Sequence, residues 1–251
     1  MKATRPSTSV RQWVSVIRRR WKRILGAGSL CTAGLLVGML AAALRSPGWY
    51  DPPIIPPEDR QKVRNNLVAA EQAFTEGLRS SSTPFVYQLL QDDVNRWIAM
   101  RREIYPLIDE LTPPQLADPF VVFQDGLITV SGRYRTHLVD VVLSADFVPA
   151  MEDGCLVLRA KAVHCGSVRV PLSFGGMKFG EPIERGRGET WPGSPAMSGD
   201  FIRGLRLESE AWWKNGGSAY RVQRVSVEAG RLQIEIEPLG RRQPPDRKHQ
   251  D

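Results

Sequence analysis

The strongest constraint on this chain is an uncharged apolar run near its N-terminus. Ile24–Leu44 contains 21 residues and no charged side chain. A helix rising about 1.5 Å per residue would extend roughly 31 Å over this run, which matches the thickness of one hydrocarbon core. Trp21 precedes the run and Trp49-Tyr50 follow it, as aromatic residues at membrane interfaces do. The sequence therefore predicts a transmembrane helix over residues 24–44.

The basic residues predict the orientation of this helix. Residues 1–23 carry eight Lys and Arg side chains and no acidic one. Of 34 basic residues in the chain, 26 remain for the rest, against 27 acidic residues, so the formal net charge of +7 belongs to this tail. The positive-inside rule places the tail in the cytoplasm and the following domain outside, in the periplasm. A basic nucleic-acid footprint would lie on the domain or on a long tail, so we expect no nucleic-acid partner.

Two alternatives to a permanent anchor remain open. Ala41-Ala42-Ala43 resembles a signal-peptide cleavage site, although the preceding basic region is unusually long for a signal peptide. Arg18–Lys22 is loosely similar to a twin-arginine export signal. The domain leaves the cytoplasm in each case.

Gly34 and Gly38 form a GxxxG pattern that favours self-association of helices, but lipid-exposed small residues give the same pattern.

The remaining chain divides by composition. Residues 45–57 are proline-rich and predict a semi-rigid stalk that holds the domain off the membrane. We expect residues 58–239 to form an α+β domain and residues 240–251, which are polar, to form a disordered tail. The domain opens with a helix over Glu58–Leu78, an extended segment over Phe85–Leu90 and a second helix over Asp92–Arg102. The stripe of the first helix consists of Val63, Leu67, Ala70, Phe74 and Leu78.

Three later segments share one hairpin pattern, in which a glycine separates two extended apolar runs. The glycines are Gly126, Gly154 and Gly230, and glycine readily adopts the positive φ of a tight turn. The second and fourth residues after each glycine are apolar, which predicts an antiparallel β-meander with one consistently buried face. These residues are Ile128, Val130, Leu156, Leu158, Leu232 and Ile234. The strand Leu138–Val148 extends the apolar face with Val139, Val141, Leu143, Ala145 and Phe147.

A long segment rich in Gly, Pro and Arg, Leu172–Ser198, interrupts the sheet as a lid, a binding loop or a disordered region. A third helix is predicted over Phe201–Lys214, with Phe201, Leu205 and Trp212 on one stripe. This helix could cover the sheet or act as a movable gate. The last hairpin is expected over Tyr220–Leu239.

Catalytic motifs are missing from the sequence. Its three histidines do not have metal-ligand spacing, and it contains neither a G-x-S-x-G elbow nor a phosphate-binding loop. His137 and His164 lie at the ends of predicted strands, where a solvated or hydrogen-bonded surface histidine is expected. Asp92-Asp93 suits a helix start better than a catalytic pair. We therefore expect no catalytic residue, no metal and no cofactor, and a protein that is not an enzyme.

The cysteines do not indicate a disulfide framework. Cys31 lies inside the apolar run, and Cys155 and Cys165 end one predicted strand. At about 3.3 Å per residue the latter two would be roughly 33 Å apart, which is too far for a disulfide.

Several motifs, in order, resemble a known family. They are the run Gln88–Ile98, the P-x-V-x-F-x-x-G hairpin Pro119–Gly126, the segment Gly166–Pro171 and the last hairpin. Together, over residues 85–171 and 219–239, they resemble YpmS-like and LmeA-like bacterial envelope domains, which lie near the TULIP (tubular lipid-binding) superfamily. Two features depart from the family pattern. Gln91 replaces the usual Ser/Thr helix cap, so Asp92 would cap instead, and Leu172–Ser198 has no counterpart.

The resemblance implies a TULIP-like half-barrel, in which a curved sheet wraps around two or three helices and leaves an apolar groove for an acyl chain. The first hypothesis is therefore an anchored periplasmic protein that binds a membrane lipid or another amphiphile. The alternative is a non-catalytic scaffold of an envelope complex, in which the same residues are simply core. The groove candidates are Ile128, Val130, Val139, Val141, Leu143, Ala145, Phe147, Leu156 and Leu158.

Overall fold

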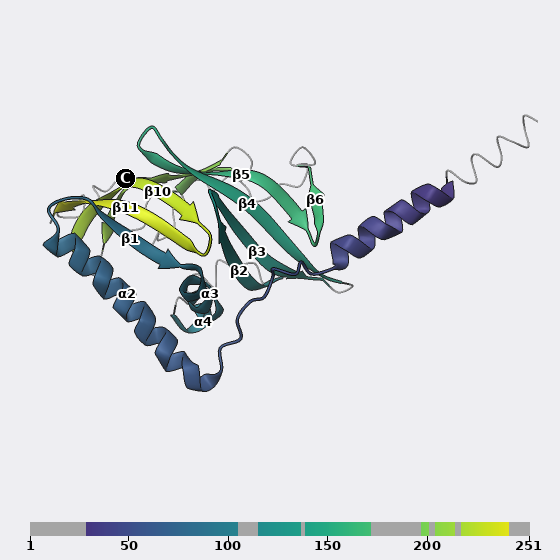
Figure 1. Cartoon of the computed structure of the whole chain (residues 1–251), viewed down its shortest axis with the longest axis horizontal. Helices are drawn as coiled ribbons and strands as arrows, with labels where there is room; N and C mark the ends of the chain where they lie inside the picture. Colours follow the sequence, from purple (N-terminus) through teal and green to yellow (C-terminus); the bar gives the residue numbers. More distant parts are fainter. Residues whose placement is uncertain are drawn as a thin grey trace, which may run out of the picture.

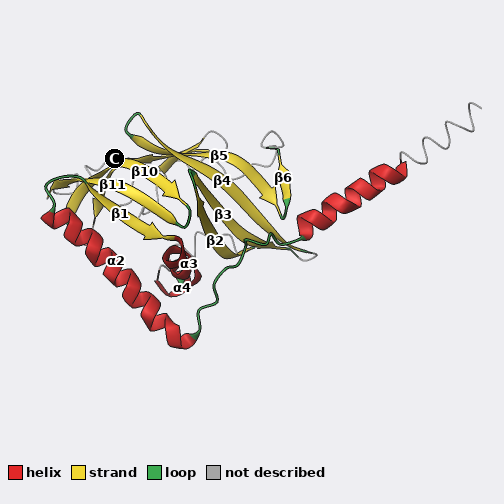
Figure 2. Cartoon of the chain, in the orientation of Figure 1, coloured by secondary structure: helices red, strands yellow, loops and turns green. Residues whose placement is uncertain are grey.

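The computed structural model describes residues 29–104, 115–136, 139–171, 197–200, 204–213 and 217–240. Within them the chain is an α+β protein with a few helices and two antiparallel sheets (Figures 1 and 2). The helices are η1 (Pro57–Asp59), α2 (Arg60–Ser80), α3 (Gln91–Ala99) and α4 (Arg101–Ile104). The expectation of an antiparallel sheet combined with helices is confirmed at this level.

The strands form one four-stranded and one seven-stranded sheet. The first has the order β1-β11-β10-β9, with β1 (Phe85–Leu90), β9 (Glu210–Trp213), β10 (Ser218–Glu228) and β11 (Arg231–Gly240). The second has the order β2-β3-β4-β5-β8-β7, and β6 pairs with β5. Its strands are β2 (Leu116–Gln124), β3 (Leu127–Arg135), β4 (Asp140–Glu152), β5 (Cys155–Cys165), β6 (Val168–Val170), β7 (Met197–Asp200) and β8 (Gly204–Glu208).

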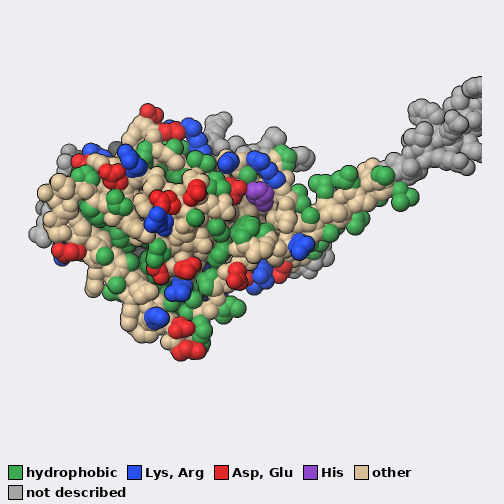
Figure 3. All heavy atoms as spheres, in the orientation of Figure 1, with side chains coloured by type: hydrophobic (Ala, Val, Ile, Leu, Met, Phe, Trp, Pro, Cys, Tyr) green, Lys and Arg blue, Asp and Glu red, His purple; other side chains and the backbone are tan. Residues whose placement is uncertain are grey.

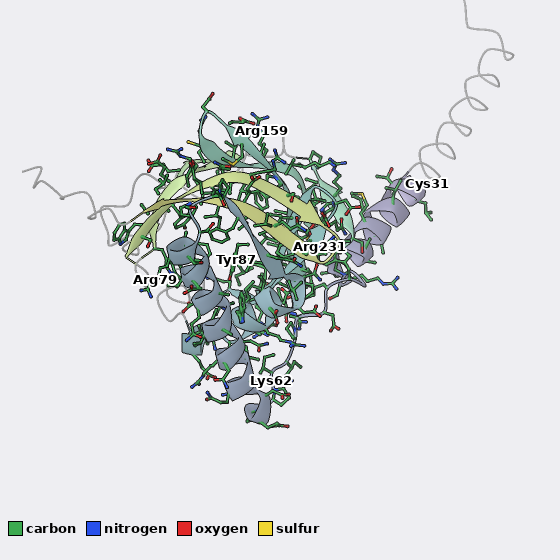
Figure 4. All side chains as sticks on the ribbon, turned by 60° about the vertical axis from the view of Figure 1, so that its left-hand side comes forward. Cys31, Lys62, Arg79, Tyr87, Arg159 and Arg231 are labelled. Carbon is green, nitrogen blue, oxygen red and sulfur yellow. The ribbon has the colours of Figure 1, made fainter. Side chains whose placement is uncertain are left out.

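Helix α2 packs against the four-stranded sheet through the predicted stripe. Val63, Leu67, Phe74 and Leu78 are buried along it. Phe74 and Leu78 form a core cluster with Ile236 of β11, and aromatic side chains surround this cluster. The Tyr87 hydroxyl donates to the Ala70 carbonyl at 3.1 Å, so this side chain lies between α2 and the arched strands (Figure 4). The predicted helix, the extended segment Phe85–Leu90 and their packing face are therefore confirmed.

The chain passes from one sheet to the other at a buried residue, Ser209. Ser209 lies between β8 of the seven-stranded sheet and β9 of the four-stranded sheet, and it is 6% exposed. Its amide donates to the Gly154 carbonyl at 3.3 Å, and its carbonyl accepts from the Val222 amide at 2.8 Å. One continuous stretch of chain thus contributes a strand to each sheet.

That stretch corrects the predicted third helix. The described part of Phe201–Lys214, residues 204–213, is not helical and contains β8 and β9. Leu205 and Leu207 alternate with Arg206 and Glu208, so the local period is that of a strand. Of the predicted helical stripe, Leu205 lies on β8 and Trp212 on β9, whereas Phe201 is outside the described residues. The prediction of a helical cover or gate is therefore wrong.

The three hairpin turns are confirmed. Gly126, Gly154 and Gly230 have φ of 70°, 72° and 76°. They connect β2 to β3, β4 to β5 and β10 to β11. The final hairpin is confirmed close to its predicted bounds. The second predicted helix is also present, but Met100 divides it into α3 and α4.

The prediction of one consistently buried face is wrong for β3 and β4. Thr129 and Ser131 are buried, whereas Val130 is 42% exposed. Both hydroxyls have partners, since Thr129 donates to Asp146 at 2.7 Å and Ser131 donates to the Phe120 carbonyl at 2.8 Å. A polar face can be buried when its groups are hydrogen-bonded in this way.

The segment before Pro57 explains what covers that polar face. Tyr50 is buried with Phe120 and Val142, and its hydroxyl donates to the Asp118 carbonyl at 2.6 Å. The predicted stalk over residues 45–57 is therefore not free of the domain at its start. Tyr50 is a core residue and not a membrane-interface residue. Ile54, further along, is 93% exposed.

The predicted transmembrane run is described only from residue 29 onward, where residues 29–44 form a helix. This helix projects from the domain on the side away from α2 (Figure 1). Its apolar side chains are exposed, as in Leu30 at 78% and Val37 at 67%. Among the residues with a described placement, no helix combines the length and the hydropathy that crossing a membrane requires. The basic tail and residues 105–114, 172–196 and 241–251 lie outside the described residues.

Candidate functional site

Eight of the nine groove candidates share one face of the seven-stranded sheet, and the ninth, Val139, immediately precedes β4. The register pairs Ile128 with Phe147 and Val130 with Ala145 across β3 and β4. Directly opposed residues of antiparallel strands point to the same face. Val141 and Leu143 follow on the same face of β4 by alternation. Leu156 and Leu158 of β5 are opposite Met151 and Pro149 of β4, which extend the same face.

Other strands continue this surface, which we call the apolar face. Leu205 and Leu207 of β8 pair with Leu158 and Leu156. Val163 of β5 pairs with Ala145, and Phe123 of β2 pairs with Ile128. Sequence alternation alone does not single out these four residues, because the partner strands and their register are not readable from one strand. The wrong prediction of a helix over Phe201–Lys214 also prevented Leu205 and Leu207 from being recognised as strand residues.

Burial varies across the apolar face. Phe123, Phe147 and Val163 are buried. Val130 and Val139 are 42% and 41% exposed, and the other candidates are intermediate. The face is therefore closed around these three side chains and open at Val130 and Val139.

Helix α3 closes the β2 edge of this sheet. Asn95 is 3% exposed, and its side chain both donates to the Val121 carbonyl and accepts from the Val121 amide, each at 2.8 Å. Gln91 accepts from the Phe123 amide at 2.7 Å. Unpaired strand edges can associate with other chains. Here the side chains of Asn95 and Gln91 bond to backbone groups of Val121 and Phe123 at the edge of β2.

Gln91 is a poor helix cap by residue type, and the structure gives it a different role. The N-cap position of α3 is Leu90, and the cap has no side-chain hydrogen bond. Asp92 therefore does not cap the helix as expected, although it lies in the first turn with Asp93. Gln91 instead joins the start of the helix to β2 through its side chain. Its backbone amide donates to the Gly230 carbonyl at 2.9 Å and so joins the helix to the β10–β11 turn as well.

A polar cavity of about 390 Å³ lies on the opposite face of the same sheet. Its floor includes Thr129, Ser144, Asp146 and His164, which alternate with the apolar residues along β3, β4 and β5, and Val122 and Gln124 of β2. Pro47, Gly48 and Trp49 form one wall, and Gly166 and Ser167 of the β5–β6 turn form another. We call this space the polar cavity.

The floor of the polar cavity has a defined hydrogen-bond arrangement. Thr129 donates to Oδ1 of Asp146 at 2.7 Å. Nδ1 of His164 lies 3.8 Å from Oδ2 of Asp146, which is too long for a direct hydrogen bond. Ser144 is opposite His164 in the register, and its hydroxyl is buried without a hydrogen-bond partner. His164 is next to last in β5, at the strand end where it was expected, and its side chain, 28% exposed, lines this cavity.

The cavity wall also fixes the N-terminal helix. The Ser167 amide donates to the Ala42 carbonyl at 3.1 Å. Gly166 has φ of 56°, and a Cβ atom on it would lie 2.2 Å from the Ala43 carbonyl oxygen. The β5–β6 turn therefore packs directly on the C-terminal end of the helix of residues 29–44.

Burial shifts the titration of several side chains. It raises the pKa of the Cys165 thiol, which lowers the thiolate fraction and hence the nucleophilicity of this cysteine. Burial, followed by the charge of Asp118, raises the pKa of Tyr50, and the neighbouring Arg133 opposes the shift. Cys155 and Cys165 are both free, as their predicted separation required.

Comparison with known proteins finds no family model, no curated protein and no solved structure that matches this chain. Function must therefore be inferred from the apolar face, the polar cavity and the helix junction. Within the described part of the chain, no group of three or more His, Cys, Asp or Glu could hold a metal ion. His137 and His249 lie outside that part.

Proposed function

We propose that this protein is anchored by its N-terminal helix and binds a lipid or another amphiphile on the apolar face, outside the cytoplasm. The observation that carries the proposal is the apolar face itself, on which eight candidates from three strands lie together, with Val130 and the adjoining Val139 open to solvent. Isolated exposed apolar residues are common, but a contiguous apolar surface marks an interaction site. No catalytic step is part of the proposal.

The dimensions of the face suit one acyl chain. Val139 to Phe147 covers eight residue steps, roughly 26 Å at about 3.3 Å per step. One leaflet of a hydrocarbon core is roughly 15 Å thick. Each methylene that leaves water on this face would contribute about 0.8 kcal/mol to binding.

Membrane anchoring is supported by the composition of the helix and its junction with the domain. The space-filling view shows hydrophobic side chains along the described helix, whereas charged side chains of both signs are mixed over the visible face of the domain (Figure 3). The Ala42–Ser167 hydrogen bond would hold the domain next to the bilayer. A Cβ atom on Gly34 or Gly38 would meet nothing within 4 Å among the described residues, which leaves this helix face open to a second helix.

A scaffold role is the second candidate, and one observation favours it. Phe123, Phe147 and Val163 are buried on the same face, as they would be in an ordinary core. In that case the exposed residues of the apolar face, Val130 and Val139, would contact a partner protein of the envelope and would not hold a lipid.

Two charged substitutions on neighbouring strands test the lipid proposal. Val130→Asp introduces a charge at an exposed position of the apolar face, and Val148→Asp introduces the same charge at a 36% exposed position on the opposite face of β4. Both sites are exposed enough for the folded state to tolerate a carboxylate. Native mass spectrometry of the full chain released from detergent should detect lipid on the wild type and on Val148→Asp, and much less on Val130→Asp. Lipid-free wild-type protein would decide for the scaffold.

A further inference from the structure

The polar cavity has a charge pattern that the proposed lipid-binding face does not explain. Its lining contains Asp146 and His164 but neither Lys nor Arg among the described residues. The side chain of Asp146 is 17% exposed, so its carboxylate is largely removed from water. A carboxylate in such a position gains from a cationic partner. An anionic ligand would instead meet an unfavourable charge at the floor.

The carboxylate of Asp146 has one oxygen occupied and one open. Thr129 donates to Oδ1 at 2.7 Å, and this bond orients the group. Oδ2 has the His164 ring at 3.8 Å as its neighbour, beyond hydrogen-bond distance. Oδ2 can therefore face a ligand in the cavity.

Two further groups fit a cationic ligand at the same place. The Ser144 hydroxyl, on a residue that is 3% exposed, is buried and unpartnered, which is costly unless something in the cavity bonds to it. Trp49 lines the wall, and an indole ring attracts cations through its face. Carboxylate, hydroxyl and indole together are groups that can recognise an organic ammonium.

We propose that the polar cavity binds an organic ammonium group between Asp146, Ser144 and Trp49. Oδ2 of Asp146 pairs with the cation, the Ser144 hydroxyl bonds to a polar atom of the ligand, and the Trp49 ring covers the ammonium. The cavity volume of about 390 Å³ accommodates a headgroup-sized amine and not a large molecule. The ammonium can come from a free amine or from a lipid headgroup, since the cavity adjoins the end of the N-terminal helix.

Calorimetric titration of the full chain in nonionic detergent tests this proposal. The probe is choline chloride, and sodium chloride at equal ionic strength is the blank. Wild type should show saturable binding. Asp146→Asn keeps the size of the side chain but removes its charge, so the affinity should fall at least about tenfold, or about 1.4 kcal/mol. Asp140→Asn, the same change at an exposed site of β4 outside the cavity lining, should stay close to wild type.

A second variant tests the wall. Trp49→Leu should weaken choline binding while leaving the thermal unfolding temperature nearly unchanged, because Trp49 is 40% exposed. Absence of saturable choline binding to a folded wild type overturns the proposal, as does equal affinity of wild type and Asp146→Asn.

Short-chain lipids distinguish the two sources of the ammonium group. Below its micelle concentration, dihexanoylphosphatidylcholine should bind more tightly than choline if the cavity takes a lipid headgroup, and equally if it takes free amines. Dihexanoylphosphatidylglycerol lacks the ammonium, so its binding should not depend on Asp146. The Asp146→Asn variant should still retain lipid on the apolar face. A failure of this inference can therefore be told apart from a failure of the proposed function.

Discussion

The Gly126 amide donates to the Val227 carbonyl at 2.9 Å, which joins the β2–β3 turn to strand β10 of the other sheet. The contact is reciprocated, because the Gly230 amide donates to the Phe123 carbonyl at 3.0 Å. Asp125 adds a side-chain bond from the Ala229 amide at 3.1 Å. Two hairpins separated by about a hundred residues of chain therefore hold each other through their turns.

Substitution of the turn glycines should destabilise the domain through backbone strain alone. Gly126→Val and Gly154→Val place a β-branched residue at φ of 70° and 72°, although nothing lies within 4 Å of the new Cβ atom. We expect a loss of about 1–3 kcal/mol in the free energy of unfolding. Denaturant titration measures it. Gly48→Val is the control, since Gly48 also has open space and is not at positive φ.

Gly166→Ala should detach the N-terminal helix from the domain. The new methyl group would overlap the Ala43 carbonyl oxygen, which lies on backbone and cannot move independently. Arg45, next to this junction, should then become more accessible to trypsin in the detergent-solubilised chain. Gly154→Ala has similar backbone strain without the overlap, so its cleavage rate should match wild type. Equal cleavage of the two variants would contradict the docked helix.

Asn95→Ala should destabilise the β2 edge. The change leaves both backbone groups of Val121 without their side-chain partner in a site where Asn95 is 3% exposed. A loss of about 2–3 kcal/mol is expected from denaturant titration. Asn65→Ala, at an exposed residue that accepts a bond from Gln61 in the same helix, should change stability by no more than about 0.5 kcal/mol.

Ala145→Trp separates a groove from a packed core. Ala145 is half-buried on the apolar face, next to Val130 and Val163 in the register. A groove would accept the indole, so lipid retention would fall with little change in the thermal unfolding temperature. A closed core would be overpacked and lose about 1–3 kcal/mol. Clear destabilisation together with lipid-free wild-type protein would favour the scaffold.

The sequence predicts the local structure well where a single strand or helix carries its own signal. The α2 stripe and the turn glycines are of this kind, because their patterns need no partner. The burial of Thr129 and Ser131 could not be foreseen, since it depends on Tyr50 and Asp146, which approach from elsewhere in the chain. Alternation shows which residues share a face but not which of the two faces is covered.

The same limit explains what sequence reasoning missed at the candidate site. Alternation identifies the apolar face, but its continuation into Leu205 and Leu207 requires the β5–β8 register. Leu205 and Trp212 are also spaced as on one face of a helix, and the prediction based on this helical period is wrong, because the segment follows the two-residue period of a strand. The polar cavity combines residues of four strands with Trp49, and none of its residues has a motif spacing that would mark it in the sequence.

Alkaline pH should destabilise the aromatic cluster around α2. Burial raises the pKa of Tyr220, and burial followed by the charge of Glu71 raises the pKa of Tyr87. Below the unfolded-state pKa of about 10, both tyrosines are protonated in both states, and their contribution to stability is fully present. As the pH rises from there through the higher folded-state pKa values, only the unfolded chain releases these protons readily, so the free energy of unfolding falls. Tyr220→Phe should therefore make this fall shallower in denaturant titrations from pH 9 upward.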